Sequence, residues 1–369
     1  MACAAATLAL LVLPLGHEAQ AQEQATVPST YAHVTHSKLN GVDYKLTVVI
    51  PPDHESSPTT RYPVLYVMDG NRWALLLGVM LPRLWPMGML PKIIAVGIDY
   101  PGPSGRNQDY GPVTQRYWPM DSKRGAVNFM RVVKEEVIPF VDSGYRTDPA
   151  DRGIGGHSMG GLFSAYALLH ETETFQRFWI SSPSLFWDDE ILFKDFAAFH
   201  AKRLPKPIHV FTDVGADELP DMQSTLERFG QKLLERRSGE IILEMRTQPG
   251  ENHTTVVTSV FIRALEHLYM YQPRFVPAAS DLLRFAGRYK LPDGTLITLV
   301  SDGRDLSYRD STVEFHAGGL MRMTAYAPNK FYVRAPRVEM EFPEGSGIPQ
   351  RVRYYDAMKD ESVDAMRVP

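Results

Sequence analysis

Cysteine, clusters of basic residues and internal repeats are all scarce or missing in this sequence. The only cysteine among the 369 residues is Cys3, and no run of lysine or arginine occurs in a chain of formal net charge -4. A lone cysteine excludes a disulfide framework and a cysteine-ligated metal site. The absence of basic runs gives no sign of a nucleic-acid or anionic-membrane surface. We therefore expect neither a bound metal nor a nucleic-acid partner, and the composition leaves the oligomeric state open.

Long hydrophobic runs are also missing. The apolar stretch at residues 7–15 is too short to span a membrane. It precedes Ala19-Gln20-Ala21, which is typical of a signal-peptide cleavage site, although no lysine or arginine comes before it. We expect residues 1–21 to be a signal peptide and the mature protein to be secreted or periplasmic. Because Cys3 lies in this segment, the mature protein would have no thiol.

Strands alternate with helices through residues 22–275. Residues 62–68 and 92–98 are apolar on both faces, as buried parallel strands are, and they end at Asp69 and Asp99. Further segments with strand patterns, each followed by a helical pattern or a loop, are residues 152–157, 175–180, 207–212 and 240–247. Two antiparallel strands are expected within residues 31–50, joined at Asn40-Gly41. The pattern predicts an α/β fold with a mostly parallel central sheet.

The connection at residues 100–120 is rich in proline, glycine and aromatic residues. We expect an irregular loop there, and loops of this length usually carry binding groups. A helix is expected to follow over residues 123–141, with an apolar stripe formed by Val127, Met130, Val133, Val137 and Ile138.

The pattern changes after Pro273. Short segments with alternating or β-branched residues are separated by glycine, proline, aspartate and asparagine. We expect strands at residues 296–300, 306–309, 322–326, 331–334, 338–342 and 351–355. This composition is typical of antiparallel strands. Residues 276–369 are therefore predicted to form a second, small all-β domain.

The segment Gly156-His157-Ser158-Met159-Gly160 fits the G-x-S-x-G pattern of a nucleophile elbow. In that motif a sharp strand-to-helix turn exposes the serine hydroxyl above the sheet. Glycines are required beside the serine because a Cβ there would collide with the neighbouring helix. The pentapeptide is common by chance, so partners for Ser158 must decide its role.

A serine hydroxyl becomes nucleophilic when a base accepts its proton and a carboxylate orients that base. His253 follows the last predicted strand of the sheet, where the base is expected, and the alternative is an ordinary loop histidine. The acid is expected in the loop after residues 207–212, where Asp213, Asp217 and Glu218 compete. We favour Glu218, with Asp217 in reserve.

Acyl transfer also requires two N–H donors for the developing oxyanion. One is expected to be the backbone N–H of Met159, which follows the nucleophile, and the other to lie near Gly70 or Asn71, after strand 62–68.

Residues 31–270 resemble the esterase D-like branch of the α/β hydrolases, and within it the siderophore esterases. The resemblance rests on six segments, 65–70, 106–110, 155–161, 182–187, 214–218 and 252–253. It implies an α/β-hydrolase fold, with Ser158 as nucleophile, His253 as base and Glu218 at the acidic position. Residues from about 281 onward resemble the small lipocalin-like β domain that follows various secreted serine hydrolases.

The sequence thus predicts a secreted serine esterase that works through an acyl-serine intermediate. Its expected substrate is a small-molecule ester, and no cofactor is expected. Arg106 is a candidate to bind the substrate, and the alternative is a surface arginine paired with Asp109. Trp118 and Trp187 could line an acyl or aryl pocket or simply cover the core. Two other functions stay open, an acyltransferase using the same serine and a binding module without turnover.

Overall fold

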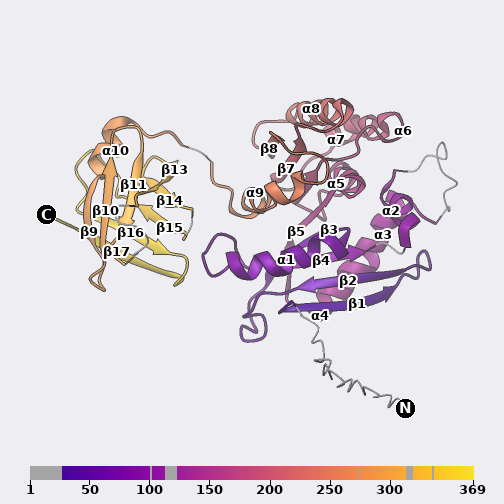
Figure 1. The fold of residues 1–369 in the computed structure, drawn as a ribbon, viewed down its shortest axis with the longest axis horizontal. Coiled ribbons are helices and arrows are strands. Elements are labelled where there is room, and N and C mark those ends of the chain that lie inside the picture. The colour runs from indigo at the N-terminus through magenta and orange to yellow at the C-terminus, as the bar shows by residue number, and fades with distance from the viewer. Residues whose placement is uncertain (1–26, 100–101, 113–122, 274, 313–318, 335) are drawn as a thin grey trace, which may run out of the picture.

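Two β-sheets organise the chain (Figure 1). The structure is a computed structural model that describes residues 27–99, 102–112, 123–273, 275–312, 319–334 and 336–369. The predicted signal peptide and Trp118 lie outside the described residues. Within the described residues, no helix is long and apolar enough to cross a membrane.

The first sheet has eight strands in the order β1-β2-β4-β3-β5-β6-β7-β8. Neighbouring strands from β4 to β8 are parallel, whereas β1 pairs antiparallel with β2, and β2 with β4. This confirms the predicted fold, an α/β-hydrolase sandwich with a mostly parallel sheet. Its strands are β1 Thr30–His36, β2 Asp43–Val49, β3 Tyr62–Met68, β4 Ile94–Asp99, β5 Thr147–His157, β6 Arg177–Ser181, β7 Ile208–Gly215 and β8 Ile241–Gln248.

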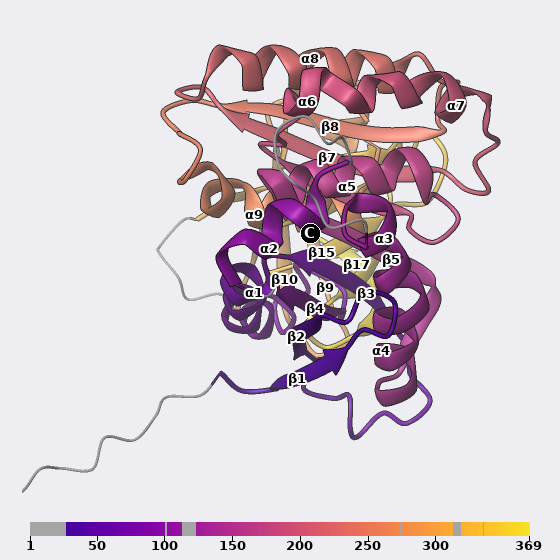
Figure 2. The same cartoon turned by 90° about the vertical axis from the view of Figure 1, so that its right-hand side faces the viewer.

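Helices cover both faces of this sheet because its parallel strands are apolar on both sides. On one face, α1 (Gly70–Leu84) and α9 (Val256–Met270) contribute to one buried cluster. On the other face, helices including α5 (Met159–His170) and α8 (Pro220–Leu234) contribute to a second cluster. Figure 2 shows these helices on either side of the strands. Because these strands are parallel, their carboxyl ends meet along one edge of the sheet, where ligands bind in open α/β folds.

Three local predictions are corrected. The segment expected to be an irregular loop contains helix α2, Gly102–Tyr110. The β1–β2 connection is longer than a two-residue turn, because His36 pairs with Asp43. The helix after residue 123 has three parts, α3 Ala126–Val132, the π-helical turn η1 Val133–Val137 and α4 Ile138–Gly144. Val127, predicted in its buried stripe, is 53% exposed. The chain between β6 and β7 forms three short helical elements, α6 Trp187–Glu190, the 3₁₀ turn η2 Ile191–Asp195 and α7 Phe196–Ala201.

The second sheet has nine antiparallel strands in the order β12-β11-β10-β9-β17-β16-β15-β14-β13. Its two outermost strands are consecutive in sequence and are separated only by Met323, so the sheet must curl until its edges approach. The predicted all-β fold of this region is confirmed. Two of its strands, β9 and β17, are not among those predicted from the sequence. The elements are α10 Ala279–Phe285, β9 Gly287–Lys290, β10 Leu296–Ser301, β11 Leu306–Asp310, β12 Met321–Arg322, β13 Thr324–Ala327, β14 Lys330–Val333, β15 Val338–Glu341, β16 Arg351–Asp356 and β17 Glu361–Val368.

The two sheets have separate cores, and polar groups form part of the contact between them. The core of the second sheet draws only on residues from 275 onward. The Arg334 guanidinium forms a two-pronged ion pair with Glu266 of α9, with both N–O distances 2.7 Å. The backbone N–H of Arg337 donates to the Met87 carbonyl at 2.9 Å.

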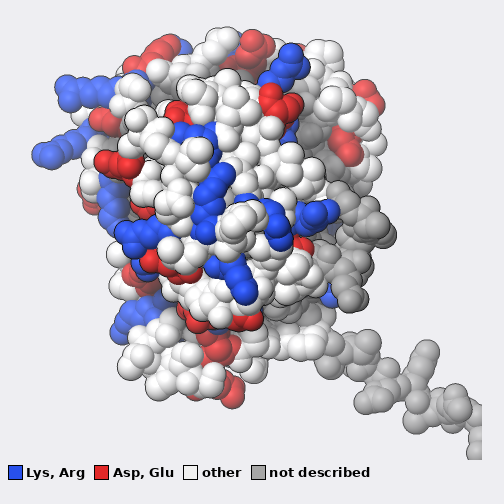
Figure 3. All heavy atoms as spheres, turned by 90° about the vertical axis from the view of Figure 1, so that its left-hand side faces the viewer, with Lys and Arg blue, Asp and Glu red and all other residues white. Residues whose placement is uncertain are grey.

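The face of the molecule on the side of the second sheet carries basic and acidic side chains together (Figure 3).

Candidate active site

The predicted nucleophile lies at the turn between β5 and α5. Ser158 has φ 61° and ψ -119°, a backbone conformation that is strained for a residue with a Cβ. Its N–H donates to the Ser181 carbonyl at 3.0 Å. A Cβ on Gly156 would lie 2.6 Å from the Gly160 carbonyl carbon, so glycine is required where strand and helix meet. This is the local geometry of a nucleophile elbow.

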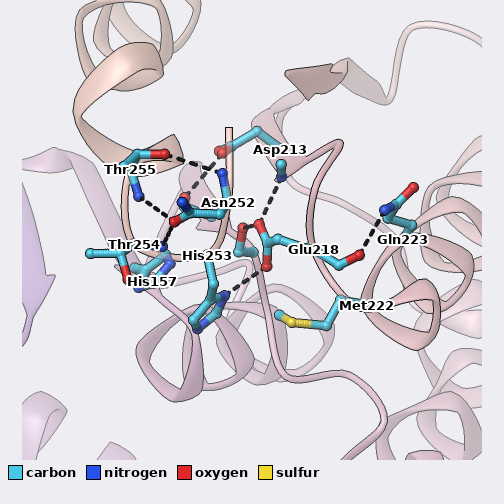
Figure 4. A network of polar contacts seen from close by, with 12 residues as sticks. His157, Asp213, Glu218, Met222, Gln223, Asn252, His253, Thr254 and Thr255 are labelled. Atoms are coloured by element: carbon cyan, nitrogen blue, oxygen red, sulfur yellow. Dashed lines mark hydrogen bonds and ion pairs between the residues drawn. The ribbon is translucent and has the colours of Figure 1, made fainter. Parts of the chain in front are cut away.

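The predicted base and acid are in direct contact. His253 Nδ1 lies 2.7 Å from Glu218 Oε2 (Figure 4). The other carboxylate oxygen accepts hydrogen bonds from the Gly215 N–H at 2.7 Å and from the Ser182 hydroxyl at 2.5 Å. Burial would raise the pKa of Glu218, but the hydrogen bonds from His253, Ser182 and Gly215 outweigh it and lower the pKa below its usual value. The carboxylate is thus held ionised against the imidazole.

The other two carboxylates of this loop do not contact His253. Asp217 is exposed. Asp213 is fully buried and accepts from the Ser181 hydroxyl at 3.1 Å. Burial raises the pKa of Asp213 well above its usual value, and the nearby Glu218 charge adds to the increase. Of the three competing residues, Glu218 has the geometry of an orienting acid.

A second imidazole packs against the predicted base. The His157 and His253 rings have centroids 4.4 Å apart and are tilted by 39°. His157 is 7% exposed, and burial together with the nearby His253 lowers its pKa to about 3. Within the described residues, no hydrogen bond joins the Ser158 hydroxyl to His253. The nucleophile elbow contacts the His253 ring through the side chain of His157, the residue before Ser158. Sequence reasoning missed this contact because nothing in the spacing of the two histidines signals it.

The predicted oxyanion donors begin two helices at the same sheet edge. Gly70 is the first residue of α1 and Met159 the first of α5, so neither N–H has an acceptor within its own helix. The Asn71 N–H, in contrast, donates to the Asp99 carboxylate at 2.6 Å. That hydrogen bond already occupies the Asn71 N–H, which leaves Gly70 as the better of the two predicted donors in this loop.

Arg106 forms its ion pair with Asp69. Its guanidinium donates to both carboxylate oxygens of Asp69, at 2.7 and 2.9 Å, and to the His157 carbonyl at 2.9 Å. Among the described contacts the partner of Arg106 is Asp69 and not the Asp109 considered as an alternative, whose carboxylate accepts hydrogen bonds from Arg124 and Tyr44. No sequence spacing signals the contact with Asp69.

Trp187 is partly buried against the core of the first sheet. Its ring lies 3.3 Å from the position that a Cβ on Gly111 would occupy. The ring therefore flanks the end of helix α2, and its predicted role in lining a substrate pocket stays a prediction. Within the described part of the chain, no group of histidine and carboxylate side chains could hold a metal ion.

The sheet order and the elbow define the chain as an α/β hydrolase. The model of the Esterase family matches residues 37–277. The chain therefore belongs to that family and is a carboxylesterase-type hydrolase. The residues after 277 lie outside the match.

Curated relatives and a solved structure resemble the same region. The ferri-bacillibactin esterase BesA of Bacillus subtilis (strain 168) is 28% identical over 267 residues, covering 65% of this chain and 89% of the relative. An apo-salmochelin esterase of Escherichia coli O6:H1 is 30% identical over 171 residues, 42% of this chain and 53% of the relative. The crystal structure of the BES protein from Bacillus cereus matches with a TM-score of 0.61 at 25% identity, covering 67% of this chain and 97% of that one.

Proposed function

We propose that this esterase is secreted and works through an acyl-serine intermediate with Ser158 as nucleophile, His253 as base and Glu218 as orienting acid. The observation that carries the proposal is the 2.7 Å contact between His253 Nδ1 and the buried Glu218 carboxylate, which also accepts hydrogen bonds from Ser182 and Gly215. A buried carboxylate on Nδ1 fixes the tautomer whose Nε2 is free to accept a proton. The strained backbone at Ser158 supports its assignment as the residue that gives up that proton.

The reaction would proceed in two halves. Ser158 Oγ attacks the ester carbonyl carbon while His253 Nε2 takes the hydroxyl proton, and the carbonyl electron pair moves to oxygen. The Gly70 and Met159 N–H groups stabilise this oxyanion. When it collapses, the C–O bond to the alcohol breaks, and the imidazolium protonates the departing oxygen. Water then attacks the acyl-serine by the same route and releases the carboxylic acid.

The proposed substrates are siderophore-type esters. Two relatives are named for siderophore esters, a ferri-bacillibactin and a salmochelin. Secretion is supported by the hydrophobic stretch and the Ala19-Gln20-Ala21 pattern at the amino terminus.

The test compares purified protein with Ser158→Ala on short-chain p-nitrophenyl esters, together with titration by a fluorophosphonate. We expect wild type to turn over and to label stoichiometrically, and Ser158→Ala to do neither. Glu218→Gln should lower kcat by about 10²- to 10⁴-fold because the orienting charge is lost. Asp217→Asn is the matched control and should leave kcat within about twofold.

Other outcomes discriminate between functions. A panel of siderophore, feruloyl and acetyl-sugar esters would identify the substrate class. Absence of labelling and turnover in folded wild-type protein would contradict the serine mechanism. Labelling with acyl transfer to added alcohols in preference to water would instead establish an acyltransferase.

A further inference from the structure

The residue before the Gly70 donor has an unusual backbone. Asp69 lies between β3 and α1 with φ 57° and ψ 50°, in the left-handed region that residues with a Cβ seldom occupy. Its side chain is only 1% exposed. Because the peptide between residues 69 and 70 carries the Gly70 N–H, the conformation of Asp69 sets the direction of that donor.

Two side chains of helix α2 hold Asp69 in place. Arg106 grips its carboxylate at both oxygens, at 2.7 and 2.9 Å, and the Tyr110 hydroxyl accepts the Asp69 N–H at 3.1 Å. Tyr110 is fully buried, and its ring stacks on Phe163 of α5 with centroids 5.7 Å apart. Asp69 is thus fixed through both its backbone and its side chain.

The same guanidinium also reaches the nucleophile elbow. Arg106 Nη2 donates to the His157 carbonyl at 2.9 Å, one residue before Ser158 and two before Met159. Arg106 therefore connects the loop that carries Gly70 to the turn that carries Met159. An arginine can do this because its planar fork presents several donors in a fixed geometry, whereas a lysine offers one compact ammonium.

We infer that Arg106 is a positioning residue that holds the Gly70 and Met159 N–H groups at the separation required by the oxyanion. The inference rests on the proposed function and replaces the expected contact of Arg106 with the substrate. Within the described residues, its guanidinium donates at least three hydrogen bonds to the protein, and its side chain is 18% exposed. Its effect is accordingly on the transition state, which carries the oxyanion, and not on binding of the neutral ester.

The test measures kcat and KM of Arg106→Lys on p-nitrophenyl acetate, a substrate too small to depend on a distant binding residue. We expect kcat to fall roughly 10- to 100-fold and KM to change by less than about threefold. A trifluoromethyl ketone adds to Ser158 Oγ and presents its oxygen as an oxyanion. Its inhibition constant should rise by the factor by which kcat/KM falls.

A double-mutant cycle tests the route through Asp69. Asp69→Asn preserves side-chain shape and tolerance of left-handed backbone but loses the charge. Combined with Arg106→Gln, its effect on kcat should be strongly non-additive, because both changes break the same contact, the ion pair between Arg106 and Asp69. If Arg106→Lys does not fold, Asp69→Asn and Tyr110→Phe address the same loop. Arg131→Lys, in an exposed 3.0 Å pair with Glu135, is the matched control and should leave kcat unchanged.

Three results for the Arg106 and Asp69 variants would each overturn the inference, besides full activity of Arg106→Lys. One is a rise in KM with unchanged kcat, which indicates substrate binding. Another is unchanged affinity for the ketone, and the third is an additive cycle. Turnover by Ser158→Ala in the same assays would contradict the proposed function and this inference with it. An inactive Ser158→Ala beside a fully active Arg106→Lys would contradict the inference alone.

Discussion

At the scale of single residues, hydrogen bonding decides how two buried carboxylates near this site titrate. Glu218 is buried but receives three hydrogen bonds, and its pKa falls. Asp213 is more deeply buried, accepts one side-chain hydrogen bond and leaves Oδ1 without a partner among the described residues, and its pKa rises. Burial raises the pKa of both carboxylates, but the pKa of Glu218 falls because three hydrogen bonds outweigh its burial, whereas the more deeply buried Asp213 accepts only one side-chain hydrogen bond among the described residues.

His157 should make the stability of the protein depend on pH. Its folded-state pKa of about 3 lies below the value of about 6.5 for an unfolded histidine. Between these values the unfolded chain binds the extra proton, so stability is full above about pH 6.5 and is lost as the pH falls. From pH 7 to pH 5 we expect wild type to lose about 1–2 kcal/mol more unfolding free energy than His157→Gln.

Urea unfolding of both proteins at the two pH values measures this difference. Other titrating groups, such as His209 with its pKa lowered to about 4, are present in both proteins and cancel. Equal pH dependence in wild type and variant would show that His157 is solvated in the folded state.

At the scale of elements, the site is built where the sheet and its helices come closest. Three residues with a Cβ and positive φ surround it, Asp69 at 57°, Ser158 at 61° and Ser182 at 37°. Each costs roughly 1–3 kcal/mol and persists only when its surroundings fix it. The fixing contacts are the Arg106 fork on Asp69 and the Ser182 hydroxyl bond to Glu218. Three of the strained positions in the described residues therefore lie at the strand ends that carry the proposed chemistry.

Gly156→Ala tests how closely β5 and α5 must approach. The added Cβ would lie 2.6 Å from the Gly160 carbonyl carbon, a backbone atom that cannot rotate away. We expect a loss of roughly 1–3 kcal/mol in stability and of at least about 10²-fold in kcat/KM, since α5 and the Met159 N–H must shift. Thermal unfolding and ester hydrolysis measure the two effects.

Gly144→Ala is the matched control because a Cβ there meets nothing within 4 Å. At the end of helix α4 it should leave activity unchanged and stability equal or slightly higher. If Gly156→Ala behaved like this control, the tight elbow would not be a requirement of the fold.

At the scale of the whole molecule, the second sheet is a unit with its own core. Its centre contains Phe285, whose ring stacks on Phe342 with centroids 4.0 Å apart. The contacts to the first sheet include ion pairs such as Arg334 with Glu266, which contribute little when partly exposed. Because each sheet has its own core, we expect the two to unfold in separate transitions.

Phe285→Ala should therefore destabilise the second sheet alone. We expect a cost of about 3–5 kcal/mol in the transition of that domain and unchanged kcat/KM on p-nitrophenyl esters. Differential scanning calorimetry resolves the transitions. Phe199→Ala, which empties a buried position in the first core, should move the other transition. A single transition displaced equally by both variants would mean that the two sheets unfold together.

The sequence by itself determined the architecture and the residues of the proposed mechanism. Buried parallel strands reveal themselves as continuous apolar runs, and the elbow as glycines about a serine, because both are local steric requirements. The same locality explains the failures. Helix α2 is hidden in a segment rich in glycine and proline, and β17 lies at the chain end without a clear alternating pattern.

Only the tertiary structure decided which charges meet. The sequence offered three acids for His253 and Asp109 as a partner for Arg106. In the fold His253 contacts Glu218, whose carboxylate turns inward and accepts from the Gly215 N–H. Arg106 contacts Asp69, because β3 ends next to α2. Electrostatic pairing depends on distances of a few ångströms between residues far apart in the chain, and no spacing or composition encodes such distances.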